Sequence, residues 1–297
     1  MTNETNQDYV YALAASSNFS EDGILFAAKR SGLFRSTDRG QTWQPAYGSL
    51  GVDQPLPTTY VATSPEFTHD HTVFAAVGGN ILRSTDGGEN WQYAELGKPA
   101  PIVSTLATST RFAEDGLVLA ATLEDGIFRS TSQESQWTGW NFGLLDSTIY
   151  ALLFSGDGCI YAGAESGIFY STTGGRSWLE VDFPVEMAPV FCLASIQKHL
   201  YAGTEENGLF KSKDGGRSWE QLSVSGTIEQ ILAEESSGIL VVQGDALLFS
   251  KDGGETWERR AGSEVGSPIS CVTAPLGLGP GAPLWVGLSN GEVVRAN

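Results

Sequence analysis

The stretch KSKDGGRSWEQL, residues 211–222, brings a carboxylate, hydroxyl groups and two glycines close together. An aspartate in a glycine-rich loop begins many calcium sites, because carboxylate and carbonyl oxygens converge where glycine lets the chain bend sharply. Asp214 could also be a catalytic carboxylate, or it could accept hydrogen bonds from the backbone of a tight turn. One copy of the stretch does not separate these three interpretations.

The pattern occurs six times, and every copy ends in a tryptophan. Its first serine recurs at intervals of 48, 46, 41, 41 and 38 residues. Such spacing is close to the period of a four-stranded unit repeated around a ring. The recurring residues are Ser36, Asp38, Trp43, Ser84, Asp86, Trp91, Ser130, Trp137, Ser171, Trp178, Ser212, Asp214, Trp219, Ser250, Asp252 and Trp257.

Short apolar runs surround each copy. Before the serine, a hydrophobic pair, small residues, a turn and a second apolar pair indicate a hairpin, as in LFAAKRSGLFRS at residues 25–36. An alternating apolar run precedes the hairpin, as in YVYALAAS from Tyr9, and another short run follows the tryptophan. We therefore predict an all-β chain with four strands in each repeat.

Six repeats and a seventh that ends before any box predict a seven-bladed β-propeller of four-stranded antiparallel blades, forming a single domain over residues 1–297. We expect residues 1–8 to supply the strand that the last blade lacks, because closure removes exposed sheet edges. The expected blades are 9–48, 57–97, 101–143, 148–183, 189–223, 227–261 and 267–297.

The repeats resemble the BNR or Asp-box family, whose box reads S-x-D-x-G-x-x-W. The resemblance covers nearly the whole chain and implies a β-propeller. The family includes sialidases, sortilin-type receptors, xyloglucan-degrading glycosidases and photosystem-assembly factors. It implies no single activity, because one fold hosts many functions.

Comparison of the six boxes favours a turn. Ser132 and Thr173 stand where the other copies have aspartate, yet every copy keeps its tryptophan. A structural turn tolerates that loss, whereas a calcium site takes roughly six to eight oxygens and each box offers one carboxylate. We expect the serine and aspartate to accept backbone hydrogen bonds and the indole to pack into the blade, with all six indoles equally buried.

The composition limits the partners. A formal net charge of −18 repels phosphate backbones and anionic lipid, so it disfavours nucleic acid and membranes and favours a basic protein or a cation. Three cysteines without CxxC spacing and three histidines form no pattern for zinc or a disulfide framework. There is neither a secretory signal pattern nor an apolar run of the ~20 residues that a membrane span needs. We expect a cytoplasmic monomer without a cofactor.

One set of turns is acidic. In a propeller the turns between second and third strands open on one face, and the boxes lie on the opposite face. We expect the acidic turn residues to gather around one mouth of the ring, either as a rim that binds a basic partner or as a solvated rim that keeps the protein soluble. This acidic rim comprises Glu124, Asp125, Glu165, Glu205, Glu206 and Asp245.

Two classes of function remain, and the sequence favours the first. Resemblance to photosystem-assembly factors and sortilin-type receptors implies a non-catalytic protein-interaction or assembly scaffold. Resemblance to sialidases implies a glycan-binding module or a glycoside hydrolase. Sialidases need three convergent arginines, the first in an FRIP-like strand that this sequence lacks, whereas Arg35, Arg83 and Arg129 share one position beside the box.

Other glycosidase mechanisms are also disfavoured. The xyloglucan-degrading enzymes use two tandem propellers, and this chain has room for one. A hydrolase of another kind would need paired carboxylates roughly 5 to 9.5 Å apart, for which Glu165 and Glu205 are the candidates. We assign no catalytic residue.

Overall fold

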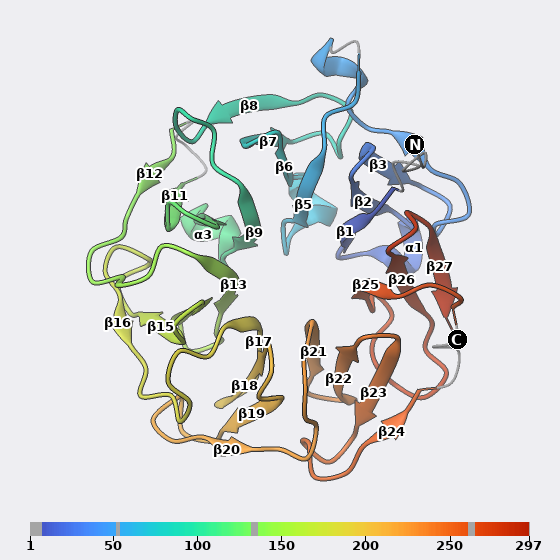
Figure 1. Ribbon diagram of the computed structural model, residues 1–297. Helices are drawn as coiled ribbons and strands as arrows, with labels where there is room; N and C mark the ends of the chain where they lie inside the picture. Colours follow the sequence, from blue (N-terminus) through green and yellow to red (C-terminus); the bar gives the residue numbers. More distant parts are fainter. Residues whose placement is uncertain (1–7, 52–53, 132–135, 261–264, 297) are drawn as a thin grey trace, which may run out of the picture.

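The computed structural model describes residues 8–51, 54–131, 136–260 and 265–296. Seven antiparallel sheets stand around a central opening as the blades of a propeller (Figure 1). The chain builds the blades in sequence order, and the ring closes where β1 of blade 1 contacts β25 of blade 7. The predicted seven-bladed propeller is confirmed.

Six blades have four strands, and blade 7 has three within the described residues. The first strand of each blade lies innermost and the last lies at the outer edge (Figure 1). The expected closure by residues 1–8 falls almost entirely outside the described residues. The strands are β1 (Val10–Ala15), β2 (Leu25–Lys29), β3 (Gly32–Ser36) and β4 (Gln44–Pro45); β5 (Thr58–Thr63), β6 (Val73–Val77), β7 (Asn80–Ser84) and β8 (Gln92–Glu95); β9 (Val103–Thr108), β10 (Val118–Thr122), β11 (Ile127–Ser130) and β12 (Thr138–Gly139); β13 (Ile149–Phe154), β14 (Ile160–Ala164), β15 (Ile168–Ser171) and β16 (Leu179–Glu180); β17 (Val190–Ile196), β18 (His199–Thr204), β19 (Leu209–Ser212) and β20 (Glu220–Gln221); β21 (Gln230–Glu234), β22 (Gly238–Gln243), β23 (Ala246–Ser250) and β24 (Glu258–Arg259); and β25 (Ile269–Thr273), β26 (Leu284–Leu288) and β27 (Val293–Ala296).

The innermost strands of six blades share a β-bulge near their start. In blade 1, Val10 pairs with Lys29 and Ala12 pairs with Ala28, so Tyr11 is the extra residue. A bulge bends the strand and changes the direction of a side chain. Six side chains are thereby placed at the same level of the ring, and they are Tyr11, Thr59, Ser104, Tyr150, Phe191 and Ser270.

Small bulge residues connect neighbouring blades. The innermost strands belong to separate sheets and do not pair with one another. The backbone N–H and C=O groups on their free edges therefore need other partners. Thr59 Oγ1 donates to the Val103 carbonyl at 2.8 Å, and Ser104 Oγ donates to the Ile149 carbonyl at 2.5 Å. The hydroxyls of Thr59 and Ser104 therefore bridge one blade to the next.

The second strand of each blade lies inside its sheet, and both faces of that sheet pack against neighbouring blades. Its side chains are therefore buried on both faces. Every residue of β6, β10, β14 and β26 is buried. The blades approach most closely at glycine: a Cβ atom on Gly287 of blade 7 would lie 2.6 Å from Val10 Cγ1 of blade 1. Apolar second strands thus supply much of the core between blades.

Three short helical turns cover the blade boundaries on the box face. They are α1 (Phe19–Asp22), α2 (Phe67–Asp70) and α3 (Phe112–Asp115), and a 3₁₀ turn spans Gly48–Leu50. The phenylalanine of each helical turn packs on an aromatic residue of the preceding blade, with ring centroids 4.7 Å apart for Phe19 and Trp285. Phe67 and Phe112 make the same contact with Phe26 and Phe74. None of the helices in the described part of the chain is long and apolar enough to cross a bilayer.

An aspartate closes each helical turn. Ser64 Oγ donates to Asp70 Oδ2 at 2.7 Å, and the Thr72 backbone N–H donates to Asp70 Oδ1 at 2.7 Å. His69 and His71 flank this aspartate, and the His69 side chain is largely exposed. These histidines lie in a surface turn.

The box tryptophans are not equally buried, so the expectation of equivalent burial is wrong. Trp178 is 1% exposed, whereas the other five are partly exposed. The loop that follows β12 covers Trp178: the indole Nε1 donates to the Trp140 carbonyl at 3.0 Å, and the Trp178 backbone N–H donates to the Phe142 carbonyl at 2.9 Å. In contrast, Trp219 Nε1 donates to Gly216 of its own box. The loop of the preceding blade therefore contributes to the burial of Trp178.

This difference predicts unequal effects of removing the indoles. Trp178→Ala should lower the free energy of unfolding by about 3 to 5 kcal/mol, because it leaves a large cavity in the core. Trp219→Ala is the matched variant and should cost less, because its indole is already partly solvated. Urea unfolding followed by circular dichroism measures both losses, and equal losses would contradict the structural difference.

Candidate interaction face and central channel

The serine and aspartate of each full box bond to each other and to the turn. Ser212 Oγ donates to Asp214 Oδ1 at 2.9 Å and accepts from the Gly216 N–H at 2.8 Å. Asp214 Oδ1 accepts from the Ser218 N–H at 2.9 Å, and Oδ2 accepts from Ser218 Oγ at 2.6 Å. The boxes that begin at Ser36, Ser84 and Ser250 have the same arrangement. Both carboxylate oxygens therefore accept hydrogen bonds inside the turn.

These bonds favour the charged carboxylate. The hydroxyl and the backbone N–H of Ser218 lower the pKa of Asp214 to about 2, and Thr42 has the same effect on the pKa of Asp38. Asp86 and Asp252 also have lowered pKa values, because their boxes donate equivalent hydrogen bonds. A carboxylate bonded in this way has little capacity left for catalysis.

The fourth box shows that a hydroxyl can replace the carboxylate. Thr173 Oγ1 accepts from the Ser177 N–H at 2.9 Å, and Ser171 Oγ accepts from the Gly175 N–H at 3.0 Å. Ser132 of the third box lies outside the described residues. No group of three or more His, Cys, Asp or Glu side chains that could hold a metal occurs among the residues that the structure describes.

The basic residues beside the boxes contact the next blade. Arg129 Nε donates to the Gly174 carbonyl at 3.0 Å, and Lys211 Nζ donates to the Gly253 carbonyl at 2.7 Å. Arg35 lies 3.4 Å from Glu89 in the following box. Lys211 is 5% exposed, so it connects blades and does not present its charge to a partner. These cations do not form the arginine cluster that a sialidase would need.

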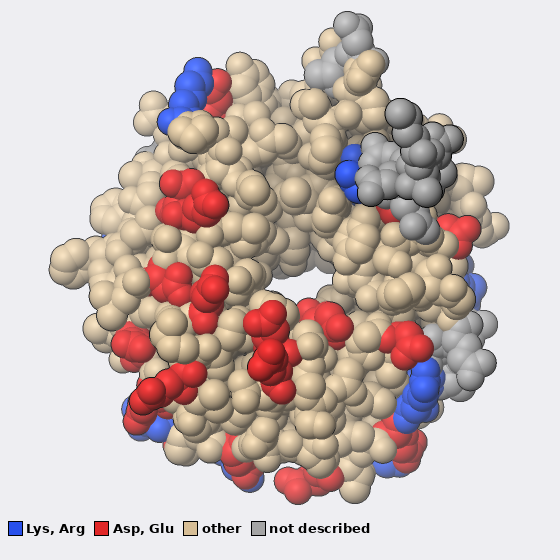
Figure 2. Space-filling model, viewed as in Figure 1, with Lys and Arg blue, Asp and Glu red and all other residues tan. Residues whose placement is uncertain are grey.

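The acidic rim lies on the opposite face from the boxes. Its members occupy the turns that join β10 to β11, β14 to β15, β18 to β19 and β22 to β23, and all six are exposed. Figure 2 shows acidic side chains on the left and lower sides of the central opening and few basic ones near it. Asp245 lies 3.7 Å from Arg259. For the other five members, no Lys or Arg nitrogen within 4.0 Å is found among the described residues.

Two further carboxylates lie on this face, and the sequence analysis missed them. Asp146 accepts from the Ser166 N–H of the β14–β15 turn at 2.8 Å. Glu229 accepts from the Gly244 N–H of the β22–β23 turn at 3.0 Å. Both residues precede an innermost strand. In a propeller, the loops that lead into the first strands lie on the same face as the turns between second and third strands. Acidic residues in those loops could therefore have been assigned to this face from the sequence.

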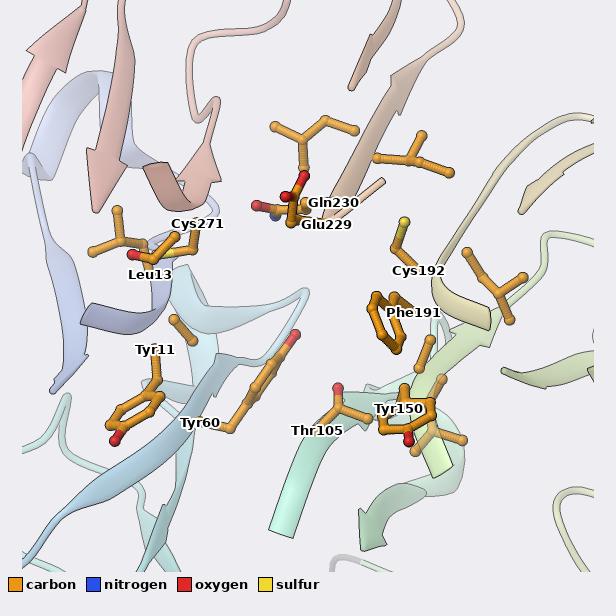
Figure 3. Close-up of a pocket in the computed structure, with 17 residues that line it drawn as sticks. Tyr11, Leu13, Tyr60, Thr105, Tyr150, Phe191, Cys192, Glu229, Gln230 and Cys271 are labelled. Carbon is orange, nitrogen blue, oxygen red and sulfur yellow. The ribbon is translucent and has the colours of Figure 1, made fainter. Parts of the chain in front are cut away.

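The channel mouth on this face is hollow and partly aromatic. A cavity of about 360 Å³ lies among the starts of the innermost strands, where Tyr60, Tyr150, Phe191 and Glu229 contribute to its wall (Figure 3). Tyr150 Oη donates to Glu165 Oε2 at 3.1 Å. Partial burial, that bond and the negative charges of Glu165, Glu205 and Asp146 raise the pKa of Tyr150 to about 12. The cavity therefore lies in a negative electrostatic field.

Two cysteines lie in the same layer of the ring. Cys192 and Cys271 follow bulge residues, both are buried, and all three cysteines of the chain are free thiols. Burial raises the pKa of Cys271 to about 12 and raises that of Cys192 as well. Neither thiol is a ready nucleophile at neutral pH.

Two family models match parts of the sequence, and both describe features that the structure shows. The model of the BNR/Asp-box repeat matches residues 34–45, and that of the DUF6242 beta propeller domain matches residues 144–273. The chain is therefore a β-propeller that carries Asp-box repeats. No curated protein matches its sequence.

Solved structures resemble the Asp-box propeller over nearly its whole length. They include the extracellular domain of the one component system BT4673 from B. thetaiotaomicron (TM-score 0.75, 15% identity), the GH74 xyloglucanase from Xanthomonas campestris (0.72, 16%) and YCF48 from Cyanidioschyzon merolae (0.71, 16%). The alignments cover 99%, 97% and 98% of this chain, and 39%, 52% and 96% of those chains. The propeller thus spans about two fifths of the first, half of the second and nearly all of the third. At these identities the similarity shows the fold alone.

The lowered pKa values predict that acid destabilises the Asp-box propeller. A carboxyl group whose pKa is lower in the folded state contributes stability above its unfolded pKa of about 3.9, and this contribution is lost as the pH falls through the folded pKa. The urea midpoint should therefore drop between about pH 4 and pH 2. Asp214→Asn should reduce this dependence, whereas Glu21→Gln, an exposed change in α1, should leave it intact; an unchanged pH profile in Asp214→Asn would contradict the assignment.

Proposed function

We propose that this propeller is a non-catalytic scaffold that binds a basic segment of another protein across the acidic rim. The supporting observation is the group of exposed carboxylates around one mouth of the ring, five of which have no Lys or Arg within 4.0 Å among the described residues. Carboxylates gathered on one face make the electrostatic field there negative. That field would attract a basic partner and accelerate its approach.

The two faces differ in how much of their polar surface is already bonded. On the box face, serines, aspartates and the cations beside them are engaged in hydrogen bonds within a blade or between blades. On the rim face, Glu124, Asp125, Glu205 and Glu206 project from short exposed turns. Exposed residues on loops that a rigid scaffold holds in place are common in binding sites.

A protein ligand also agrees with one structural neighbour. YCF48 bound to a D1 peptide has a TM-score of 0.70 and 17% identity, and the alignment covers 98% of this chain and 92% of that chain. The fold thus accommodates peptide binding in another protein, although the residues involved are not transferable at this identity. We propose further that the chain acts as a monomer in the cytoplasm, where its three free thiols would remain reduced.

Salt and charge substitutions test the rim. A labelled peptide rich in lysine and arginine should bind less tightly as salt is added, because exposed charges are screened over a Debye length of roughly 8 Å at physiological ionic strength. The double variant Glu205→Gln, Glu206→Gln should slow association more than it speeds dissociation. Stopped-flow fluorescence measures both rate constants.

The control is Glu21→Gln, Glu114→Gln, which makes the same change in net charge on the box face. If the affinity is insensitive to salt, or if both double variants behave alike, the rim does not bind the peptide.

A glycoside hydrolase is the second candidate, favoured by the contact of Tyr150 with Glu165 at the channel mouth. Two observations weigh against it. The pKa of Tyr150, about 12, keeps the phenol protonated and therefore a weak nucleophile at neutral pH. The lining of the cavity contains neither arginine nor lysine among the described residues, so nothing there would bind the carboxylate of a sialoside.

We accordingly expect no turnover of a fluorogenic sialoside above that of a heat-denatured sample. A measurable rate that disappears in Tyr150→Phe would instead support the hydrolase.

A further inference from the structure

We propose that the cavity at the acidic mouth of the channel binds the guanidinium group of one arginine side chain from the partner protein. This inference rests on the proposed protein-binding function and specifies the chemical group that enters the ring. The cavity, about 360 Å³, lies near the lower end of the range for pockets that hold small ligands, about 300 to 1,000 Å³. A side chain fits such a space, whereas a folded domain does not.

Three aromatic residues of the cavity stand where other blades have small side chains. Tyr11, Tyr150 and Phe191 occupy the bulge position of their inner strands, where other blades have Thr59 or Ser104. Those small residues bridge to the next blade through a hydroxyl. Large aromatic side chains at the same position remain partly exposed at the channel mouth, which is unfavourable in water without a ligand.

The arrangement of the rings suits a planar cation. Tyr60 directs its hydroxyl into the cavity, and Phe191 approaches from another strand (Figure 3). The rings of Phe191 and Tyr150 are 5.0 Å apart and nearly perpendicular, at 77°, so they offer surfaces in two directions. Aromatic faces attract cations, and guanidinium groups also stack on them because they are planar and weakly hydrated.

Glu229, which lines the cavity, can pair with that cation, and Glu165 lies beside the wall residue Tyr150. Glu229 lies across the cavity from Tyr60 (Figure 3) and accepts hydrogen bonds from the Gly244 backbone N–H. Glu165 accepts one from Tyr150. Neither carboxylate has a Lys or Arg within 4.0 Å among the residues that the structure describes. Carboxylates can accept two parallel hydrogen bonds from arginine, a geometry that lysine cannot supply.

Single-site peptides test this inference with the whole chain. We would titrate the protein with an acetylated and amidated Gly-Ser-Gly-Arg-Gly-Ser-Gly peptide by calorimetry or NMR, and repeat the titration with lysine or citrulline at the centre. Citrulline keeps the shape of arginine and lacks its charge. We expect the arginine peptide to bind more tightly than the lysine peptide and the citrulline peptide to show no binding.

Substitutions then locate the site. Phe191→Leu should weaken binding of the arginine peptide by about 3- to 30-fold, as expected for a lost cation–π contact, whereas Phe191→Tyr keeps the ring and should bind within about 2-fold of the natural protein. Glu229→Gln should weaken binding, and Glu255→Gln, which makes the same change in charge on the box face, should not. Circular dichroism checks that each variant is folded; if Phe191→Leu is not, the two glutamate variants decide.

The possible results separate the two proposals. If the basic peptide binds through Glu205 and Glu206 but citrulline replaces arginine without loss, or Phe191→Leu and Glu229→Gln have no effect, the rim proposal stands and the arginine site is wrong. If neither the basic peptide nor the arginine peptide binds, both proposals are wrong. Binding that requires arginine, the Phe191 ring and Glu229 supports the site.

Discussion

Packing between neighbouring blades is the interaction on which the rest of this structure depends. A single four-stranded blade has two apolar faces and can bury both only against other blades. The second strands are accordingly buried over most of their length, and Gly287 allows blade 7 to approach Val10 of blade 1 closely enough to close the ring. Because every blade has two neighbours, both faces of its inner strands can pack against other blades.

Polar contacts at the blade boundaries set the relative position of the blades. On the box face, Lys211 donates to Gly253 and Trp285 donates to Arg39, each across a boundary. At the channel, Thr59 and Ser104 donate across other boundaries. Backbone carbonyls of the boxes thus take part in contacts between blades. In the fourth box, the Thr173 hydroxyl accepts the Ser177 N–H in place of a carboxylate.

This division leaves the opposite face free to vary. Its second-to-third-strand turns carry exposed acidic residues, and aromatic side chains lie at the channel mouth. At the bulge, Thr59 and Ser104 donate hydrogen bonds to the next blade. At the same position, Tyr150 and Phe191 direct aromatic rings to the channel mouth. The same backbone position therefore serves assembly in one part of the ring and is available for binding in another.

The number of blades, the four-strand repeat, the position of the boxes and the turns that carry Glu124 and Glu205 could all be predicted from the sequence, because these features recur with a regular period. Contacts between residues of different blades could not be predicted, because they depend on how the blades pack in the ring. Phe191 and Tyr60 share a cavity because ring closure and two bulges bring their strands together, and Asp146 and Glu229 join the rim face through loops of unequal length. Trp178 is buried more than Trp219 for the same reason: a loop of the preceding blade covers it, and no pattern within its own repeat records that contact.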